Sequence, residues 1–256
     1  MTGNMDAATR GRHPERMVKA SVVKSPAARA RKPTASKRAP TLKPAERARI
    51  ETIFARFAEL TPDPRGELEY VNPYTFLVAV ALSAQATDKS VNKATAPLFA
   101  VADTPRKMLD LGVERLEGFI RTIGLYRTKA KNVIAAAHIL VDQYGGEVPL
   151  ERVALQSLPG VGRKTASVVL NQLGIEPAIA VDTHVFRVSH RLDLSQATTP
   201  DGVERELMAK VPETYKTRAH HWLILHGRYI CVARKPKCLS CPVIDLCPSA
   251  ALFIGA

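Results

Sequence analysis

A lysine and an aspartate, Lys164 and Asp182, are the residues whose types and spacing could support a reaction. Lys164 follows the stretch 158–163 (LPGVGR), in which two glycines precede a helical pattern. Glycine lets another molecule approach the backbone, and the unpaired N–H groups of a helix start attract an anion such as phosphate. We therefore predict that Lys164 and Asp182 perform chemistry on a nucleic acid held by this hairpin.

Each of these features also has a simpler interpretation. A lysine in a first helical turn is usually solvated or touches a backbone phosphate. Asp182 precedes a predicted helix at 183–192, so it could be only an N-cap. Taken alone, Gly160, Gly162 and Arg163 predict a holder of phosphate groups and no reaction.

Four cysteines form a second candidate site within 17 residues, with the spacing Cys-x6-Cys-x2-Cys-x5-Cys. This clustering favours a bound inorganic centre over a disulfide framework. A [4Fe–4S] cluster is the better match, because zinc sites usually combine two Cys-x2-Cys pairs or mix Cys with His; zinc stays open as the alternative. Between the first two cysteines lie three cations that could hold a second phosphate. The predicted ligands are Cys231, Cys238, Cys241 and Cys247, and the cations are Arg234, Lys235 and Lys237.

Charge along the chain points to a polyanionic partner. The formal net charge is +13, but residues 1–43 hold 11 Lys or Arg against 2 Asp or Glu, which leaves 26 against 22 in the remaining 213 residues. We predict a disordered basic tail at 1–43 and a weakly basic folded part. No apolar run reaches membrane-spanning length, and a cytoplasmic, nucleoid-associated bacterial protein is expected. The Arg-rich tail keeps an organellar address open.

Helical periodicity dominates the rest of the chain, and alternating strand patterns are absent. An apolar face at Ile50, Ile53, Phe54, Phe57 and Leu60 marks the first helix. Further helices are predicted at 74–83, 88–99, 105–111, 113–121, 127–143, 150–157, 163–173, 183–192, 200–210 and 216–229. The pattern predicts an all-α protein. Its histidines at 184, 220, 221 and 226, with Trp222, are interpreted as packed core groups.

Several of these motifs together resemble one family. The stretch 158–165 (LPGVGRKT) resembles the helix-hairpin-helix of the endonuclease III family of DNA glycosylases, and 181–188 (VDTHVFRV) looks like its catalytic aspartate segment. The stretch 220–229 (HHWLILHGRY) runs into the cysteine loop as in that family, and 82–88 (LSAQATD) resembles its loop that enters DNA. The resemblance covers about 45–250. One departure is Ser167, where the family usually has Asn.

The resemblance implies two helical lobes with a DNA-binding cleft between them. A six-helix barrel would span 66–176, with the helix-hairpin-helix near 150–173. Residues 44–65 and 177–256 would form the iron–sulfur lobe. The expected partner is damaged double-stranded DNA. The protein is expected to act as a monomer and not to bind a membrane.

The implied reaction is that of a bifunctional enzyme. Gln85 would fill the space of a flipped-out nucleotide, and Leu125 would wedge the duplex from the other side. Lys164 would attack C1′ and form a Schiff base, Asp182 would stabilise the developing charge, and β-elimination would cut the strand at an oxidised pyrimidine or an abasic site. Two alternatives remain: an adenine-specific mismatch glycosylase, which generally lacks the lysine, and a non-catalytic DNA-binding or redox-sensing protein.

Overall fold

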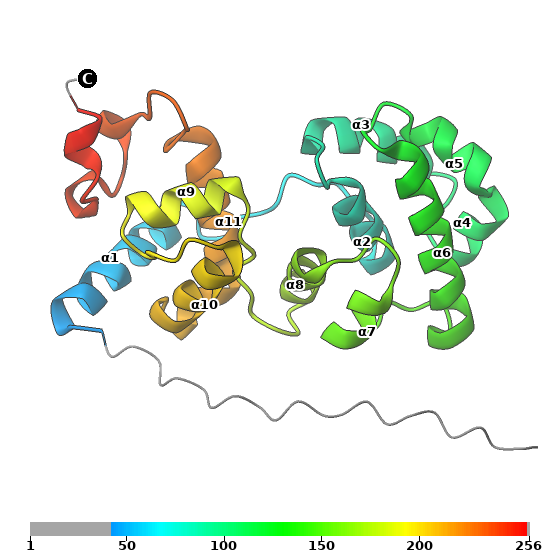
Figure 1. Cartoon of the computed structure of the whole chain (residues 1–256), viewed down its shortest axis with the longest axis horizontal. Helices are drawn as coiled ribbons and strands as arrows, with labels where there is room; N and C mark the ends of the chain where they lie inside the picture. The colour runs from blue at the N-terminus through cyan, green and yellow to red at the C-terminus, as the bar shows by residue number, and fades with distance from the viewer. Residues whose placement is uncertain (1–41, 255–256) are drawn as a thin grey trace, which may run out of the picture. The chain divides into compact units, whose positions relative to one another are not determined.

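The computed structural model describes residues 42–254, and nearly all of the predicted basic tail at 1–43 lies outside the described residues. Regular structure within 42–254 is entirely helical and includes no strand, which confirms the predicted all-α fold (Figure 1). Every predicted helix is present, with ends shifted by at most three residues. The helices are α1 Pro44–Leu60, α2 Pro73–Leu82, α3 Asp88–Phe99, α4 Pro105–Leu111, α5 Val113–Ile120, α6 Tyr126–Tyr144, α7 Arg152–Ser157, α8 Arg163–Gln172, α9 Thr183–Arg191, α10 Pro200–Lys210 and α11 Glu213–Tyr229.

Short polar side chains start several of these helices. The Asn72 side chain accepts from the Thr75 N–H, the Thr75 hydroxyl accepts from the Asn72 N–H, and Pro73 occupies the first helical position. The Thr104 side chain accepts from the Lys107 N–H and caps α4 ahead of Pro105. Because these caps satisfy N–H groups that would otherwise be unpaired, the sequence fixes the helix starts locally.

One hydrophobic core is built from consecutive helices, α2 to α8. Helix α2 is buried on nearly every side and contacts α3, α6 and α8. The fully buried side chains of this core include Leu82, Leu98, Met108, Leu116, Ile120, Leu140 and Leu155. We call this set the α2–α8 core. Its seven helices include the six-residue α7, which precedes the hairpin at 158–162.

A second core joins the first helix to the C-terminal part of the chain. Ile50, Ile53, Phe54 and Phe57 of α1 are buried against α9, α10 and α11, as the periodicity predicts. Leu60 departs from the prediction and is 63% exposed, because it is the last residue of α1 and extends beyond the packed face. We call this set the α1/α9–α11 core; Trp222 is buried in it and donates to the Thr61 carbonyl.

The α1/α9–α11 core also carries the cysteine loop. After α11 the chain makes three short 3₁₀ turns, η1 Cys238–Ser240, η2 Ile244–Leu246 and η3 Ala250–Leu252. The lobe boundaries near 65 and 176 stay predictions; the second falls in the connection between α8 and α9. Among residues 42–254, no helix is both long and apolar enough to cross a membrane.

Candidate active site

A cleft of about 1150 Å³ is lined by residues of both cores, and it contains Lys164, Asp182 and Gln85. Its walls come from the loop 63–70, the turn after α2, helix α8, the start of α9 and one side of α11. The volume exceeds that of an ordinary small-molecule pocket, which is up to about 1,000 Å³. The structure therefore brings the predicted reacting pair and the predicted space-filling glutamine into one cavity.

The hairpin before Lys164 is a tight turn held by buried apolar side chains. Leu158 and Val161 are buried, and the Val161 N–H donates to the Leu158 carbonyl. Gly160 has φ +81°, and a Cβ there would lie 3.1 Å from the Asn132 side chain, so both the conformation and the space require glycine. Gly162 faces open space and starts α8 without a side-chain cap. The exposed N–H groups of this helix start are therefore free to bind an anion.

Lys164 and its neighbour Arg163 have different surroundings. Arg163 forms ion pairs with Asp201 at 2.8 Å and Glu204 at 2.9 Å, both on α10. Lys164 is exposed toward the cleft, and within residues 42–254 no ion pair involves it. The sequence did not reveal the Arg163 pairs, because residues 38 and 41 positions away in the chain carry no local signal.

Asp182 is an N-cap and a cleft residue at the same time. Its Oδ1 accepts hydrogen bonds from the His184 and Val185 N–H groups, both at 2.8 Å. The capping interpretation is thus confirmed. Because one oxygen serves both caps, the other oxygen of the half-buried carboxylate remains for a ligand in the cleft.

Hydrogen bonds from α8 and α11 fix the backbone between Lys164 and Asp182. Asn171 of α8 is buried; it donates to the Thr217 carbonyl on α11 and accepts from the Ala178 N–H. His220 of α11 donates from Nδ1 to the Ala180 carbonyl at 2.9 Å. These three hydrogen bonds between α8, α11 and the connection thereby hold the segment that leads into Asp182.

His220 is the residue near this site that sequence reasoning placed only in the core. Its pKa is lowered to about 4, mainly by burial and then by the neighbouring His221, while the charges of Asp182 and Lys164 act on it in opposite directions. His220 is therefore neutral and close to both Lys164 and Asp182. A histidine in an apolar helix gives no signal of such proximity. His184 and His221 are half-exposed in the cleft, so their assignment to the core was wrong.

Gln85 and Leu125 lie on neighbouring loops, both in a left-handed backbone conformation. Their φ angles are +56° and +59°, and Leu125 is 64% exposed. A Cβ on Gly124 would lie 3.9 Å from the Gln85 carbonyl oxygen, which places the two loops side by side. Left-handed backbone is costly for such side chains, about 1–3 kcal/mol each, and is typical of functional loops. The fold therefore presents the two residues together.

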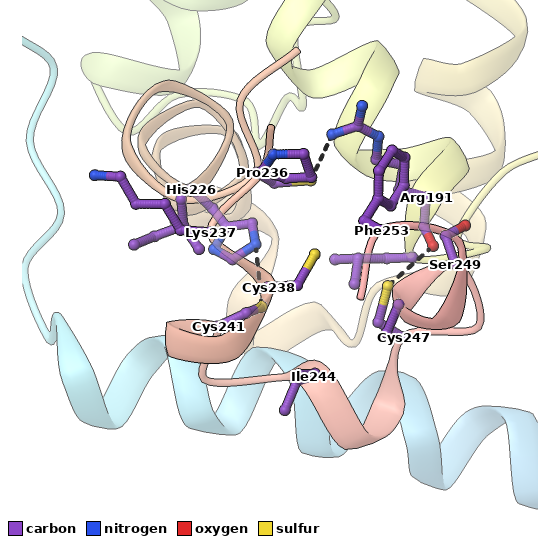
Figure 2. A pocket seen from close by; sticks show the side chains of 14 residues that line it. Arg191, His226, Pro236, Lys237, Cys238, Cys241, Ile244, Cys247, Ser249 and Phe253 are labelled. Carbon is purple, nitrogen blue, oxygen red and sulfur yellow. Dashed lines mark hydrogen bonds between the residues drawn. The ribbon is translucent and has the colours of Figure 1, made fainter. Parts of the chain in front are cut away.

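The four cysteines line a single pocket. Figure 2 shows Cys238, Cys241 and Cys247 around it, with Arg191 and His226 beside them. Arg191 donates to the Cys231 sulfur at 3.4 Å, and the Cys247 thiol donates to the Arg191 carbonyl at 3.3 Å. None of the four is in a disulfide. The sequence prediction that these thiols converge is met by the geometry.

The chemistry of these thiols fits an iron–sulfur cluster. The pKa of Cys241 is raised to about 11, mainly by burial and in smaller part by repulsion from the other three cysteines when they are thiolates. Bound irons remove that repulsion. Four thiols at the wall of one pocket match the four thiolate ligands that a [4Fe–4S] cluster takes.

The loop between the first two cysteines presents its cations to solvent. Arg234, Lys235 and Lys237 are exposed, and Lys235 has φ +52°. Arg191 holds the backbone of this loop through the Val232 and Ala233 carbonyls, at 2.8 and 3.0 Å. The predicted second phosphate contact is thus an ordered, exposed basic loop.

Comparison with known proteins agrees with both sites. The HhH-GPD superfamily of base excision DNA repair proteins matches residues 78–213, and the iron–sulfur binding domain of endonuclease III matches 231–247. Endonuclease III of Escherichia coli K12 is 55% identical over 192 residues, which are 75% of this chain and 91% of that protein. The chain belongs to the endonuclease III family. The family enzyme of Treponema pallidum is 57% identical over 187 residues, 73% of this chain and 88% of its own length.

Solved structures of endonuclease III share the fold. A trapped covalent intermediate of endonuclease III with DNA has TM-score 0.75 and 44% identity and covers 83% of this chain and 99% of its own. A non-covalent endonuclease III–DNA complex gives the same score and identity. A thermostable thymine-DNA glycosylase, 24% identical with TM-score 0.72, shares the fold alone.

Membership of this family establishes the activity that the motifs predicted. The chain is a bifunctional DNA glycosylase and abasic-site lyase for oxidised pyrimidines. Its cysteines hold a [4Fe–4S] cluster, so the zinc alternative is excluded. The adenine-mismatch and non-catalytic alternatives are likewise excluded by the family match.

Proposed function

We propose that Lys164 is the nucleophile and Asp182 the charge-stabilising carboxylate of this reaction. The observation that supports the assignment is that the exposed Lys164 and the cleft-facing Asp182 line one cavity with Gln85. A flipped nucleotide in this cavity would present C1′ to the lysine amine while Gln85 fills the vacated space in the duplex.

The steps follow from the residue types. The neutral Lys164 amine bonds to C1′, the C1′–N bond to the base breaks, and the base leaves with a proton. Asp182 stabilises the positive charge that develops on the sugar. The C1′–O4′ bond then opens, O4′ takes a proton, and C1′ and the lysine nitrogen form an iminium. This iminium acidifies the C2′ hydrogen; loss of that proton breaks the C3′–O bond, and water then releases the lysine.

We infer that two backbone-binding surfaces hold damaged double-stranded DNA on either side of the cleft. One is the hairpin, where the Gly160 and Gly162 region offers amides; the other is the basic loop of Arg234, Lys235 and Lys237. Arg163 remains a proposed phosphate ligand. To bind a DNA phosphate, it would break its ion pair with Asp201 or Glu204. The cluster orders the basic loop and takes no part in the chemical steps.

We further propose that the enzyme acts as a monomer on chromosomal DNA in the bacterial nucleoid. The bacterial relatives support this setting. Sedimentation of the enzyme with one duplex should give one protein per DNA; two per DNA would contradict the monomer.

Borohydride trapping tests the nucleophile. Lys164→Gln should lose the covalent adduct with abasic DNA while it keeps duplex affinity within about threefold, because phosphate contacts dominate binding. Lys131→Gln, which removes an exposed lysine of α6, is the matched control and should trap normally. An adduct with Lys164→Gln would show that another amine reacts.

Asp182 can be tested without disturbing its helix. Asparagine caps helices as well as aspartate does, so Asp182→Asn removes the charge and keeps the cap. We expect base release to slow by about 10²–10³-fold, the range for losing one preorganised stabilising group, with an unchanged melting temperature. Asp182→Ala should lose both rate and stability. Normal base release by Asp182→Asn would remove the aspartate from the mechanism.

A further inference from the structure

Lys129 of α6 is a buried lysine that the proposed mechanism does not use. Its side chain lies inside the molecule, and burial lowers its pKa. Its ammonium donates to two backbone carbonyls, Leu82 at 3.0 Å and Ala84 at 2.7 Å. Burying a lysine costs free energy unless its N–H donors are hydrogen-bonded, and these two bonds offset that cost.

The two carbonyls belong to the turn that carries Gln85. Leu82 ends α2, where carbonyls lack helical partners and a cation is favourable. The Ala86 N–H closes the turn on the Ser83 carbonyl, and Gln85 takes φ +56° within it. Lys129 therefore grips the backbone immediately before Gln85 and supports its costly conformation.

Lys129 also contacts the loop that carries Leu125. Lys129 lies in the first turn of α6, and its backbone N–H donates to the Leu125 carbonyl at 3.0 Å. Any residue at this position would make the backbone bond. Only a long donor side chain also reaches the turn of Gln85, so the lysine links the two loops that the Gly124 contact places side by side.

We propose that Lys129 is a positioning residue for nucleotide flipping, which fixes Gln85 and Leu125 at one separation by tying the Gln85 turn to the start of α6. The inference rests on the proposed insertion of Gln85 and Leu125 into the duplex. When Lys129 hydrogen-bonds the Gln85 turn, Gln85 and Leu125 enter the DNA as one rigid unit. Without these hydrogen bonds, each loop must be ordered separately when the nucleotide flips out of the duplex.

The test compares base release, which requires nucleotide flipping, with cleavage of an abasic site, which requires less of it. Lys129→Met keeps the length of the side chain and removes its donors. We expect single-turnover base release from thymine glycol paired with adenine to slow about tenfold, the effect of losing a hydrogen bond to a charged group. Cleavage of a preformed abasic site in the same duplex should slow less than about twofold, because no base has to be unstacked.

Further variants separate positioning from folding. Lys129→Arg keeps donors for both carbonyls and should recover most of the base-release rate, whereas Lys131→Met removes an exposed α6 lysine and should change neither step. Fluorescence of 2-aminopurine opposite the lesion should report slower insertion in Lys129→Met alone. The absorbance of the iron–sulfur cluster near 400 nm should be equal in all variants. Equal loss of both steps, or a normal base-release rate in Lys129→Met, would overturn the inference.

Single and double variants distinguish this inference from the proposal on which it rests. Gln85→Ala and Leu125→Ala should each slow base release, and adding Lys129→Met to either should cost less than the sum, because the three act as one unit. If the two alanine variants release base normally, the insertion proposal fails whatever Lys129 does. If they are slow and Lys129→Met combines with them additively, only the role of Lys129 fails.

Discussion

The two hydrophobic cores are held together in different ways. The α2–α8 core comes from one continuous stretch of chain, residues 74–170. The α1/α9–α11 core joins residues 50–57 to residues 179–243. Arginines fasten its parts: Arg49 donates to the Leu192, Asp193 and Leu246 carbonyls, and Arg56 pairs with Asp245.

The difference follows from the distance along the chain. Closing a long loop costs more entropy than packing neighbouring helices, and the α1/α9–α11 core must close one of more than a hundred residues. Charged hydrogen bonds and the iron–sulfur cluster offset that cost. Because Lys164 lies on α8 and Asp182 starts α9, the proposed reacting pair spans both cores, and the stability of each core affects the geometry of the site.

Loss of the cluster should have the largest effect and should fall on one core. Structural metal centres contribute on the order of 10 kcal/mol to folding. In Cys241→Ser we expect the α1/α9–α11 core to lose its amide-exchange protection while the α2–α8 core keeps most of its own. Leu239→Ala, which changes a residue 86% exposed in the same loop, is the control and should leave both cores protected. A uniform loss of protection would show that the two cores unfold as one.

A cavity in the other core should give the opposite pattern. Leu140 is fully buried, so Leu140→Ala should lower the free energy of unfolding by about 2–5 kcal/mol. Amide exchange should rise first in α2–α8, and the cluster absorbance should persist until global unfolding. Leu150→Ala, at a position 53% exposed, should change stability by less than about 0.5 kcal/mol. Early loss of the cluster in Leu140→Ala would contradict independent cores.

Acid should weaken the α1/α9–α11 core selectively. His220 has a folded-state pKa of about 4, below the ordinary 6.5 that it regains on unfolding, so the unfolded state binds the extra proton. Its contribution is therefore present above pH about 6.5 and is lost as the pH falls toward about 4, by up to roughly 3 kcal/mol.

The comparison is between His220→Gln and His138→Gln in urea unfolding across this range. His138 is exposed on α6 and should leave the pH dependence unchanged, whereas His220→Gln should reduce it. The remainder is expected from His226, whose pKa burial also lowers to about 4. Glutamine can still donate to the Ala180 carbonyl, so the neutral-pH stability should change little. An unaltered pH dependence in His220→Gln would assign the acid sensitivity to other groups.

The smallest effect is expected from one arginine. Arg49→Met should cost about 2 kcal/mol, because three carbonyls lose a charged donor. Arg47→Met, on the exposed side of the same helix, should cost less than about 0.5 kcal/mol. Thermal unfolding measures both, and equal effects would show that these bonds merely replace bonds to water.

The sequence predicted local features well and long-range ones poorly. Caps such as Asn72-Pro73 and the periodicity of α1 gave the helices, because these signals act over a few residues. The cysteine spacing and the LPGVGRKT motif identified the two sites. The Arg163 pairs, the nearness of His220 to Asp182 and the bonds of Lys129 depend on packing between distant segments. No local pattern encodes them, and Leu60 shows that even a correct periodicity does not say where a partner surface ends.

The Asp182 side chain is subject to two separate requirements. One carboxylate oxygen caps a helix, and the other is left for the proposed role in the reaction. In a library of all residues at position 182, a screen for folded protein alone should recover Asp, Asn, Ser and Thr, the residues that cap helices. A screen for repair in living cells should recover aspartate only. The difference between the two recovered sets would measure how much of this residue belongs to chemistry rather than to architecture.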